Sequence, residues 1–118
     1  MENLVLAYLG DAAYELYIRE YLINKGITNV NKLQKMSIKY VSASSQRRIF
    51  EKLYDIFTEE EILIYKRGRN SKGHKSKNTD IVTYKIATGF ECLLGYLYIN
   101  DKERFNYVML KVVGDLWE

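Results

Sequence analysis

The sequence contains no proline and only one cysteine and one histidine. Cys92 alone cannot form a disulfide within the chain, and together with His74 it provides too few ligands for any standard zinc cluster. No apolar run reaches the length of a membrane span, and the N-terminus lacks the basic and then apolar pattern of a secretion signal. We therefore expect a cytoplasmic protein that does not interact with membranes.

The composition is that of a globular protein, because 47% of the 118 residues are hydrophobic and 28% are charged. This length favours one compact domain, residues 1–118, with a hydrophobic core of its own. Apolar residues recur at intervals of three and four throughout, and proline does not interrupt them. The sequence therefore predicts an all-α fold.

About six helices follow from the spacing and from the residues able to cap helix ends. The expected helices are Asn3 to Asn24, with Gly26 as a stop; Asn31 to Met36; Val41 to Tyr54; Thr58 to about Arg67, beginning with a capping box; Asp80 to Ile99, capped by Thr79; and a last helix capped by Asp101 and running to about Trp117. The helix of residues 80–99 is apolar on nearly every face, so we expect it at the centre of the fold. Two glycines inside it, Gly89 and Gly95, indicate close approach of neighbouring helices.

The first helix contains a carboxylate in a run that is otherwise almost entirely apolar. In "LAYLGDAAYE", Asp11 follows Gly10, and the surrounding Leu4, Tyr8, Leu9, Ala12 and Leu16 recur at helical spacing. If this stripe is buried, an unpaired Asp11 costs several kcal/mol. Asp11 therefore has either a structural partner or a functional one.

The central helix repeats this pattern in "ATGFECLLG", where Glu91 lies among apolar residues. One explanation is that Asp11 and Glu91 share a hard cation such as Mg²⁺, which takes carboxylate oxygens and keeps several waters. The alternative is that each carboxylate meets a lysine, a tyrosine hydroxyl or a helix N-terminus. Glu15, one turn after Asp11, is either an outer partner of such a site or a solvated helix residue.

Positive charge is concentrated in one stretch of the chain. The net charge is +3, yet the window from Lys66 to Lys85 contains seven Lys or Arg and one acid, which is +6, and leaves −3 for the remainder. Its loop, "KRGRNSKGHKSKN", combines basic, amide, hydroxyl and glycine residues that suit contacts with phosphate and sugar. A solvated surface turn is the alternative. The stretch Ser42 to Arg48 is either a second phosphate-contacting surface or an exposed helix face.

Two motifs resemble those of the ribonuclease III catalytic domain. "YLGDAAYE" is similar to the family signature with its metal-binding aspartate, and "FECLLGYLYI" is similar to the second motif, whose glutamate is another ligand. The segments "KRGRN", "KNTD" and "TYKIATGFE" resemble those of the Mini-III subfamily, which consists of the catalytic domain alone. The resemblance covers nearly the whole chain and implies a single ribonuclease III-like helical domain.

The resemblance also implies an activity and its site residues. Asp11 and Glu91 correspond to catalytic metal ligands for Mg²⁺, with Mn²⁺ as a possible substitute. Ala7 and Thr88 stand where ribonuclease III proper has two further carboxylates, a departure that the Mini-III subfamily shares. The implied reaction is hydrolysis of a phosphodiester in double-stranded RNA with 5′-phosphate products, in maturation of the large-subunit (23S) ribosomal RNA precursor. Waters then fill the missing ligand positions, and metal affinity without RNA is weak.

The resemblance further implies a homodimer in which Tyr8 inserts into the partner subunit; the alternative is that Tyr8 belongs to the core. Because we expect no separate RNA-binding domain, RNA contact falls to the catalytic domain itself, through Arg67, Arg69, Asn70, Lys72, Lys75, Lys77, Asn78 and Lys85. Two other functions remain open at this point. One is a non-catalytic module that binds double-stranded RNA on the same fold, and the other is a helical protein whose basic loop binds an acidic protein partner.

Overall fold

A computed structural model describes residues 1–72 and 80–114, and within those ranges the chain is helical and contains no strand. The elements are α1 (Asn3–Asn24), α2 (Val30–Val41), α3 (Ala43–Leu53), the 3₁₀ turn η1 (Tyr54–Ile56), α4 (Glu59–Arg69), α5 (Ile81–Asn100) and α6 (Lys102–Gly114). This arrangement confirms the predicted all-α class. Over the same residues, no helix combines the length and the apolar character needed to cross a bilayer.

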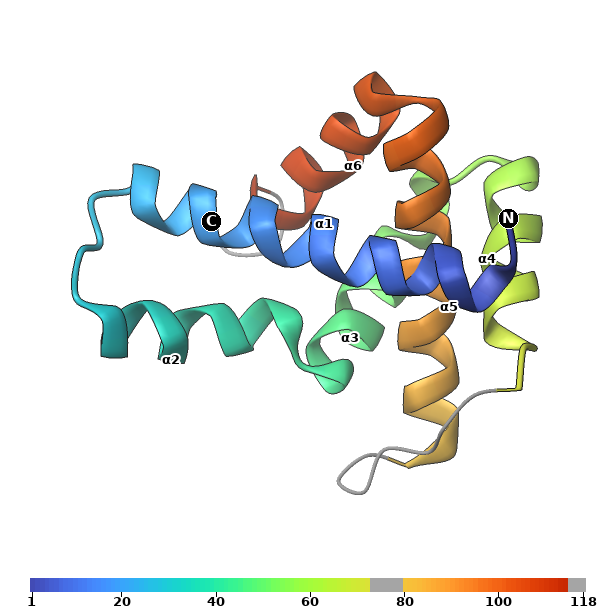
Figure 1. Cartoon of the computed structure of the whole chain (residues 1–118), viewed down its shortest axis with the longest axis horizontal. Coiled ribbons are helices and arrows are strands. Elements are labelled where there is room, and N and C mark those ends of the chain that lie inside the picture. Colours follow the sequence, from blue (N-terminus) through green and yellow to red (C-terminus); the bar gives the residue numbers. More distant parts are fainter. Residues whose placement is uncertain (73–79, 115–118) are drawn as a thin grey trace.

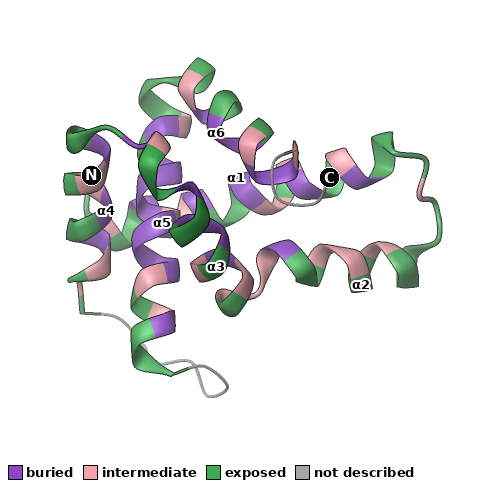
Figure 2. Cartoon of the chain, turned by 180° about the vertical axis from the view of Figure 1, so that it is seen from behind, coloured by how far each residue is buried: buried purple, intermediate pink, exposed green. Residues whose placement is uncertain are grey.

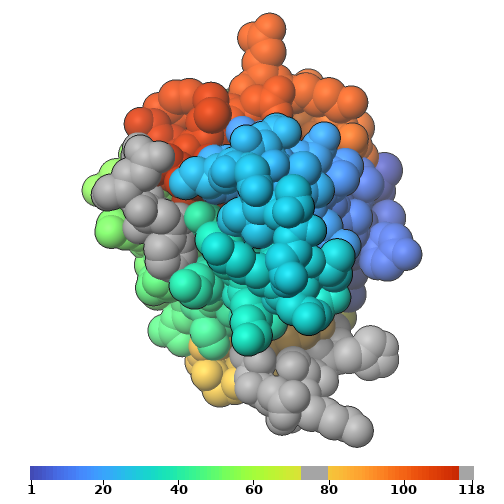
Figure 3. Space-filling model, turned by 90° about the vertical axis from the view of Figure 1, so that its left-hand side faces the viewer, coloured from blue at the N-terminus to red at the C-terminus, as the bar shows by residue number. Residues whose placement is uncertain are grey.

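Helix α5 lies at the centre, as its apolar faces predicted. It packs against α1, α3, α4 and α6, and α1 crosses it near its middle (Figure 1). Burial is concentrated along α5 and on the faces that the other helices turn toward it (Figure 2). Helix α2 packs beside α1 and α3. The end of α1 and the start of α2 form the surface at one end of the molecule (Figure 3).

Glycines allow two helices to approach α5 at contact distance. A Cβ atom on Gly10 would overlap the carbonyl oxygen of Glu91, and one on Gly95 would overlap that of Leu6, so α1 and α5 touch through their backbones. Gly89 meets α4 in the same way, against Tyr65. The close approach predicted from Gly89 and Gly95 is therefore confirmed, and it fixes the position of Asp11 relative to Glu91.

Several helix ends agree with the prediction from the sequence, and the cap of α5 does not. Thr58 and Glu61 form the predicted capping box, and the Asp101 side chain accepts a hydrogen bond from the backbone N–H of Arg104 at 3.1 Å. The cap of α5 is Asp80 rather than Thr79, because the Asp80 carboxylate accepts from the backbone N–H of Thr83 at 2.8 Å. Thr79, like Trp117, lies outside the described residues.

The region between α1 and α4 also differs from the prediction. The second helix does not end at Met36 but continues to Val41, and the third begins at Ala43 and ends at Leu53, where η1 replaces its last turn. The break between them is Ser42, whose extended backbone ends α2 and whose hydroxyl caps α3 by accepting from the Ser45 N–H at 3.2 Å. The capping serine interrupts the helical backbone for a single residue, and the periodicity of apolar residues does not detect so short a break.

The apolar stripe predicted on the first helix is not its buried face. Residues Leu6, Ala7, Gly10, Ala13, Tyr14, Ile18 and Leu22 face the core. The predicted stripe is largely exposed: Leu16 is 55% exposed and Tyr8 is 83% exposed. The prediction was wrong because α1 is apolar on both faces, and the face that packs on α5 contains the small residues that close helix contact requires.

Candidate metal and RNA-binding site

The crossing of α1 and α5 brings Asp11 and Glu91 together. Gly10 packs on the backbone of Glu91, and Asp11 is the next residue of α1. Both carboxylates line a surface cavity of about 320 Å³ and a neighbouring one of about 260 Å³. Ala7 and Thr88 also line the first cavity.

The two carboxylates have different environments. Asp11 is exposed and lies on the side of α1 that faces solvent, beside the crossing, so the cost considered for a buried aspartate does not arise. Glu91 is half-buried, and burial, followed by the nearby negative charge of Asp11, raises its pKa to about 8. Holding two negative charges together without a cation is therefore unfavourable, and a bound cation relieves that cost.

The donors at this site fit a hard cation with a water-rich shell. No group of three or more His, Cys, Asp or Glu forms among the residues that the structure describes, so Asp11 and Glu91 are the acidic ligands available. Thr88 supplies no carboxylate, and its hydroxyl donates to the carbonyl of Tyr84 at 2.8 Å. Glu15 forms an ion pair with Arg19 on the surface of α1. Two carboxylates suit Mg²⁺, which prefers oxygen ligands and retains waters.

Gln46, which the sequence indicated only as part of the stretch Ser42 to Arg48, also lies at this site. The Gln46 Nε2 atom donates to Glu91 Oε2 at 3.3 Å and to the Val41 carbonyl at 3.2 Å, while its Oε1 is buried without a hydrogen-bond partner among the described residues. Gln46 lines the cavity of about 260 Å³ with Asp11 and Glu91. The sequence did contain a signal, because Gln46 shares the apolar face of α3 with Ile49 and Phe50.

Residues at both ends of the stretch 42–48 make contacts within the fold. Ser42 caps α3, and Arg47 donates to Thr83 Oγ1 at 2.9 Å and pairs with Glu51 at 3.5 Å. Arg48 donates to the Lys39 carbonyl at 3.4 Å. These contacts favour a role in joining α3 to α2 and α5.

The described residues of the predicted RNA-binding set lie where α4 ends and where α5 begins, at one end of the molecule (Figure 1). Helix α4 includes Arg67, where the sequence predicted its end, and continues through Arg69, which is helical rather than part of a loop. Arg69 is half-buried, with its guanidinium 5.6 Å from the centre of the Tyr65 ring. The other described members of the predicted RNA-binding set are exposed: Arg67, Asn70, Lys72 and Lys85. Lys75, Lys77 and Asn78 lie outside the described residues.

Tyr8 is not part of the core of this chain. It is 83% exposed and lines the cavity of about 320 Å³ next to Asp11. Leu4 and Val5 are also exposed on this part of α1. An apolar surface therefore borders the carboxylate pair.

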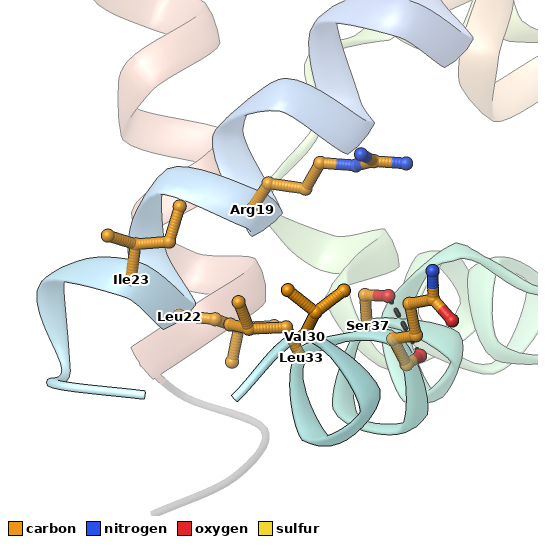
Figure 4. Close-up of a pocket in the computed structure, with 7 residues that line it drawn as sticks. Arg19, Leu22, Ile23, Val30, Leu33 and Ser37 are labelled. Carbon is orange, nitrogen blue, oxygen red and sulfur yellow. Dashed lines mark hydrogen bonds between the residues drawn. The ribbon is translucent and has the colours of Figure 1, made fainter. Parts of the chain in front are cut away.

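A separate cavity of about 250 Å³ lies between α1 and α2 (Figure 4). Leu22, Val30 and Leu33 provide its apolar wall, and Arg19 lies on its rim. Its lining includes no carboxylate, so it lacks the donors that a divalent cation requires.

Comparison with known proteins agrees with this arrangement. A model of the Ribonuclease III domain family matches residues 4–102. The chain is 46% identical to the Mini-ribonuclease 3 of Enterococcus faecalis, covering 98% of this chain and 92% of that relative, and 48% identical to the Mini-ribonuclease 3 of Clostridium tetani, covering 100% and 80%. A crystal structure of a protein from Fusobacterium nucleatum superposes with a TM-score of 0.85 and 32% identity, over 98% of this chain and 93% of that one.

Proposed function

The chain belongs to the ribonuclease III family, and on this premise we propose that it is a Mg²⁺-dependent endoribonuclease that hydrolyses double-stranded RNA and leaves 5′-phosphate ends. Mn²⁺ is the expected substitute for Mg²⁺. We further propose that the substrate is the large-subunit (23S) ribosomal RNA precursor, as the resemblance to Mini-III enzymes implies. The protein would then act in the cytoplasm, where this RNA matures.

The observation that carries this proposal is the juxtaposition of Asp11 and Glu91 at the glycine-lined crossing of α1 and α5. These two carboxylates hold the cation, and the open cavity beside them leaves room for its waters and for an RNA phosphate. When bound, Mg²⁺ lowers the pKa of a bound water and neutralises charge that develops on the phosphate. The backbone contact between the helices keeps the carboxylates in register, so little reorganisation is needed when RNA arrives.

The basic residues bind the RNA rather than perform the chemistry. Arg67, Lys72 and Lys85 are exposed on the described segments that precede and follow residues 73–79. Double-stranded RNA is recognised largely through its shape, its 2′-hydroxyls and its phosphates. We therefore propose binding that depends on duplex form and salt more than on base sequence.

We also propose that two copies of the chain form a homodimer through the apolar surface around Tyr8. The support is the exposure of Tyr8 together with Leu4, Val5 and Leu16, which otherwise leaves large apolar side chains in water. Because this surface borders Asp11, the dimer would bring each catalytic site next to the joint face of the two subunits.

Incubation of the purified protein with a structured RNA duplex, once with Mg²⁺ and once with a chelator, tests the proposed function. The expected result is internal cleavage with Mg²⁺, none with chelator, and no cleavage of a single strand of the same sequence. Intact but retained duplex in both conditions would instead identify a non-catalytic RNA-binding module. Indifference to RNA would favour a protein-binding function for the basic region.

A further inference from the structure

Gln46 is a polar residue on the buried face of α3. It is 2% exposed and lies one turn before Ile49 and Phe50, which are buried in the core. Its Oε1 atom has no hydrogen-bond partner in the described part of the chain. A buried acceptor without a partner destabilises the folded state, so an apolar residue of similar size would stabilise this position. Stability therefore does not explain the glutamine.

The contacts of Gln46 lead to the carboxylate pair. Its Nε2 spans the Val41 carbonyl, at 3.2 Å, and Glu91 Oε2, at 3.3 Å, so it links the N-terminal turn of α3 to the middle of α5. The amide occupies one of the two Glu91 oxygens and leaves the other one for a cation. The negative charge of Asp11 repels the Glu91 carboxylate. The hydrogen bond from Gln46 holds Glu91 in place against this repulsion.

The missing carboxylates make such a contact more important. Ala7 and Thr88 line the same cavity as Glu91 and supply no carboxylate of their own. The Thr88 hydroxyl instead donates to its own helix, at the Tyr84 carbonyl. Glu91 therefore has the Asp11 carboxylate on one side and the Gln46 amide, which donates to it at 3.3 Å, on the other.

We propose that Gln46 is a positioning residue, which orients Glu91 toward Asp11 through Nε2 and offers its buried Oε1 to a water that accompanies the bound cation. This inference rests on the proposed function. Mg²⁺ keeps several waters, and an orphaned acceptor in the wall of the cavity suits one of them. Groups that orient a metal ligand typically change metal affinity or activity by about 10–100-fold when they are removed.

The test compares Gln46→Met with the wild type in two measurements. Mn²⁺ binding to the protein, in the presence of a duplex with a non-cleavable linkage, is followed by the loss of the free-ion electron paramagnetic resonance signal, and thermal unfolding is measured in chelator. We expect Gln46→Met to weaken Mn²⁺ binding by about 10–100-fold while its melting temperature stays equal or rises. The Mg²⁺ concentration for half-maximal cleavage rises by the same factor. Gln46→Leu repeats the test with a different apolar shape, in case methionine does not pack.

Ile49→Val is the matched control, because it removes one methylene group from the same buried face of α3. We expect it to lower the melting temperature and to leave Mn²⁺ binding unchanged. Both Gln46 variants lowering the melting temperature with unaltered Mn²⁺ affinity would overturn the positioning role and leave the proposed function standing. A wild type that neither binds Mn²⁺ nor cleaves duplex RNA would overturn both.

Discussion

Glu91 carries the clearest electrostatic signature of the site. Burial, and then repulsion by Asp11, raises its pKa from the ordinary 4.5 to about 8. Because the folded pKa is the higher one, the folded protein binds more protons than the unfolded chain between these values. The proton on Glu91 therefore contributes to the stability of the folded protein. This contribution is complete below pH 4.5, decreases as the pH rises from 4.5 to 8, and is absent above pH 8.

Glu91→Gln is therefore expected to raise the stability of the metal-free protein at pH 8 and above, although it removes a proposed catalytic group. Thermal unfolding in chelator from pH 5 to 9 measures this effect. The difference in melting temperature between variant and wild type should be small at pH 5 and should grow through pH 8. Parallel curves for the two proteins would show that the neighbouring charge does not act on Glu91 as described.

At the scale of the elements, the contact between α1 and α5 holds the site together. A Cβ atom at Gly10 would overlap the backbone carbonyl of Glu91, and neither backbone can yield without moving a helix. Gly10→Ala should destabilise the protein by about 1–3 kcal/mol, as overpacked cores do, and should also weaken cleavage because it shifts Asp11. Denaturant unfolding measures the first effect.

Gly114→Ala is the control for this prediction, since a Cβ atom there meets no described atom within 4 Å. It should leave both stability and cleavage close to those of the wild type. If Gly10→Ala behaves like Gly114→Ala, the backbone contact does not position the carboxylates.

The junction of α4 and α5 supplies the next prediction. Replacing Arg67 and Lys85 by glutamine should weaken binding of every duplex about equally and flatten its salt dependence, by a slope of about 0.7–0.9 for each phosphate that the variant no longer binds. Turnover at saturating RNA should fall less than affinity, because the carboxylates supply the chemistry. Titration of one duplex at several salt concentrations measures the slope.

Replacing Lys32 and Lys35, two exposed lysines of α2, removes the same charge from another helix and serves as the control. Equal effects of the two double variants would indicate a general effect of net charge. A collapse of turnover with little change in affinity would instead mean that Arg67 and Lys85 position the scissile strand.

The sequence predicted the helices and their caps better than it predicted which face of each helix is buried. The central place of α5 followed from its apolar surface, and the caps at Thr58 and Asp101 followed from local hydrogen-bonding chemistry. The buried face of α1 did not follow, because backbone contact selected small residues such as Gly10, whereas the larger apolar residues, Tyr8 among them, face outward.

At the candidate site, too, short motifs predicted single residues, whereas contacts between residues far apart in the sequence could not be predicted. Its two carboxylates were predicted from motifs, each within a few residues of sequence. Their unequal burial depends on how α1 sits on α5, and Gln46 reaches Glu91 across 45 residues of sequence. Such a contact has no local pattern, so only the packed structure brings it to notice.

At the scale of the whole molecule, the apolar surface beside the site predicts an assembly. Tyr8→Ala should shift the proposed homodimer toward monomer, because the loss of an anchoring aromatic typically costs about 2 kcal/mol or more at an interface. Sedimentation velocity over a range of concentrations measures this shift. Tyr107→Ala, at an exposed tyrosine of α6, should leave the assembly unchanged. A dimer equally stable in both variants would exclude Tyr8 from the interface.

The central claim is that Asp11 and Glu91 act as one metal-holding pair, and single-turnover cleavage of a duplex by Asp11→Asn, Glu91→Gln and the double variant tests it most directly. Each single variant should keep its fold and its affinity for RNA, yet cleave about a hundredfold or more slowly, since even outer partners of a metal cost about 10–100-fold. The double variant should be no slower than the slower single one, because residues that act as a unit are not additive. Near-normal cleavage by either single variant would contradict the claim.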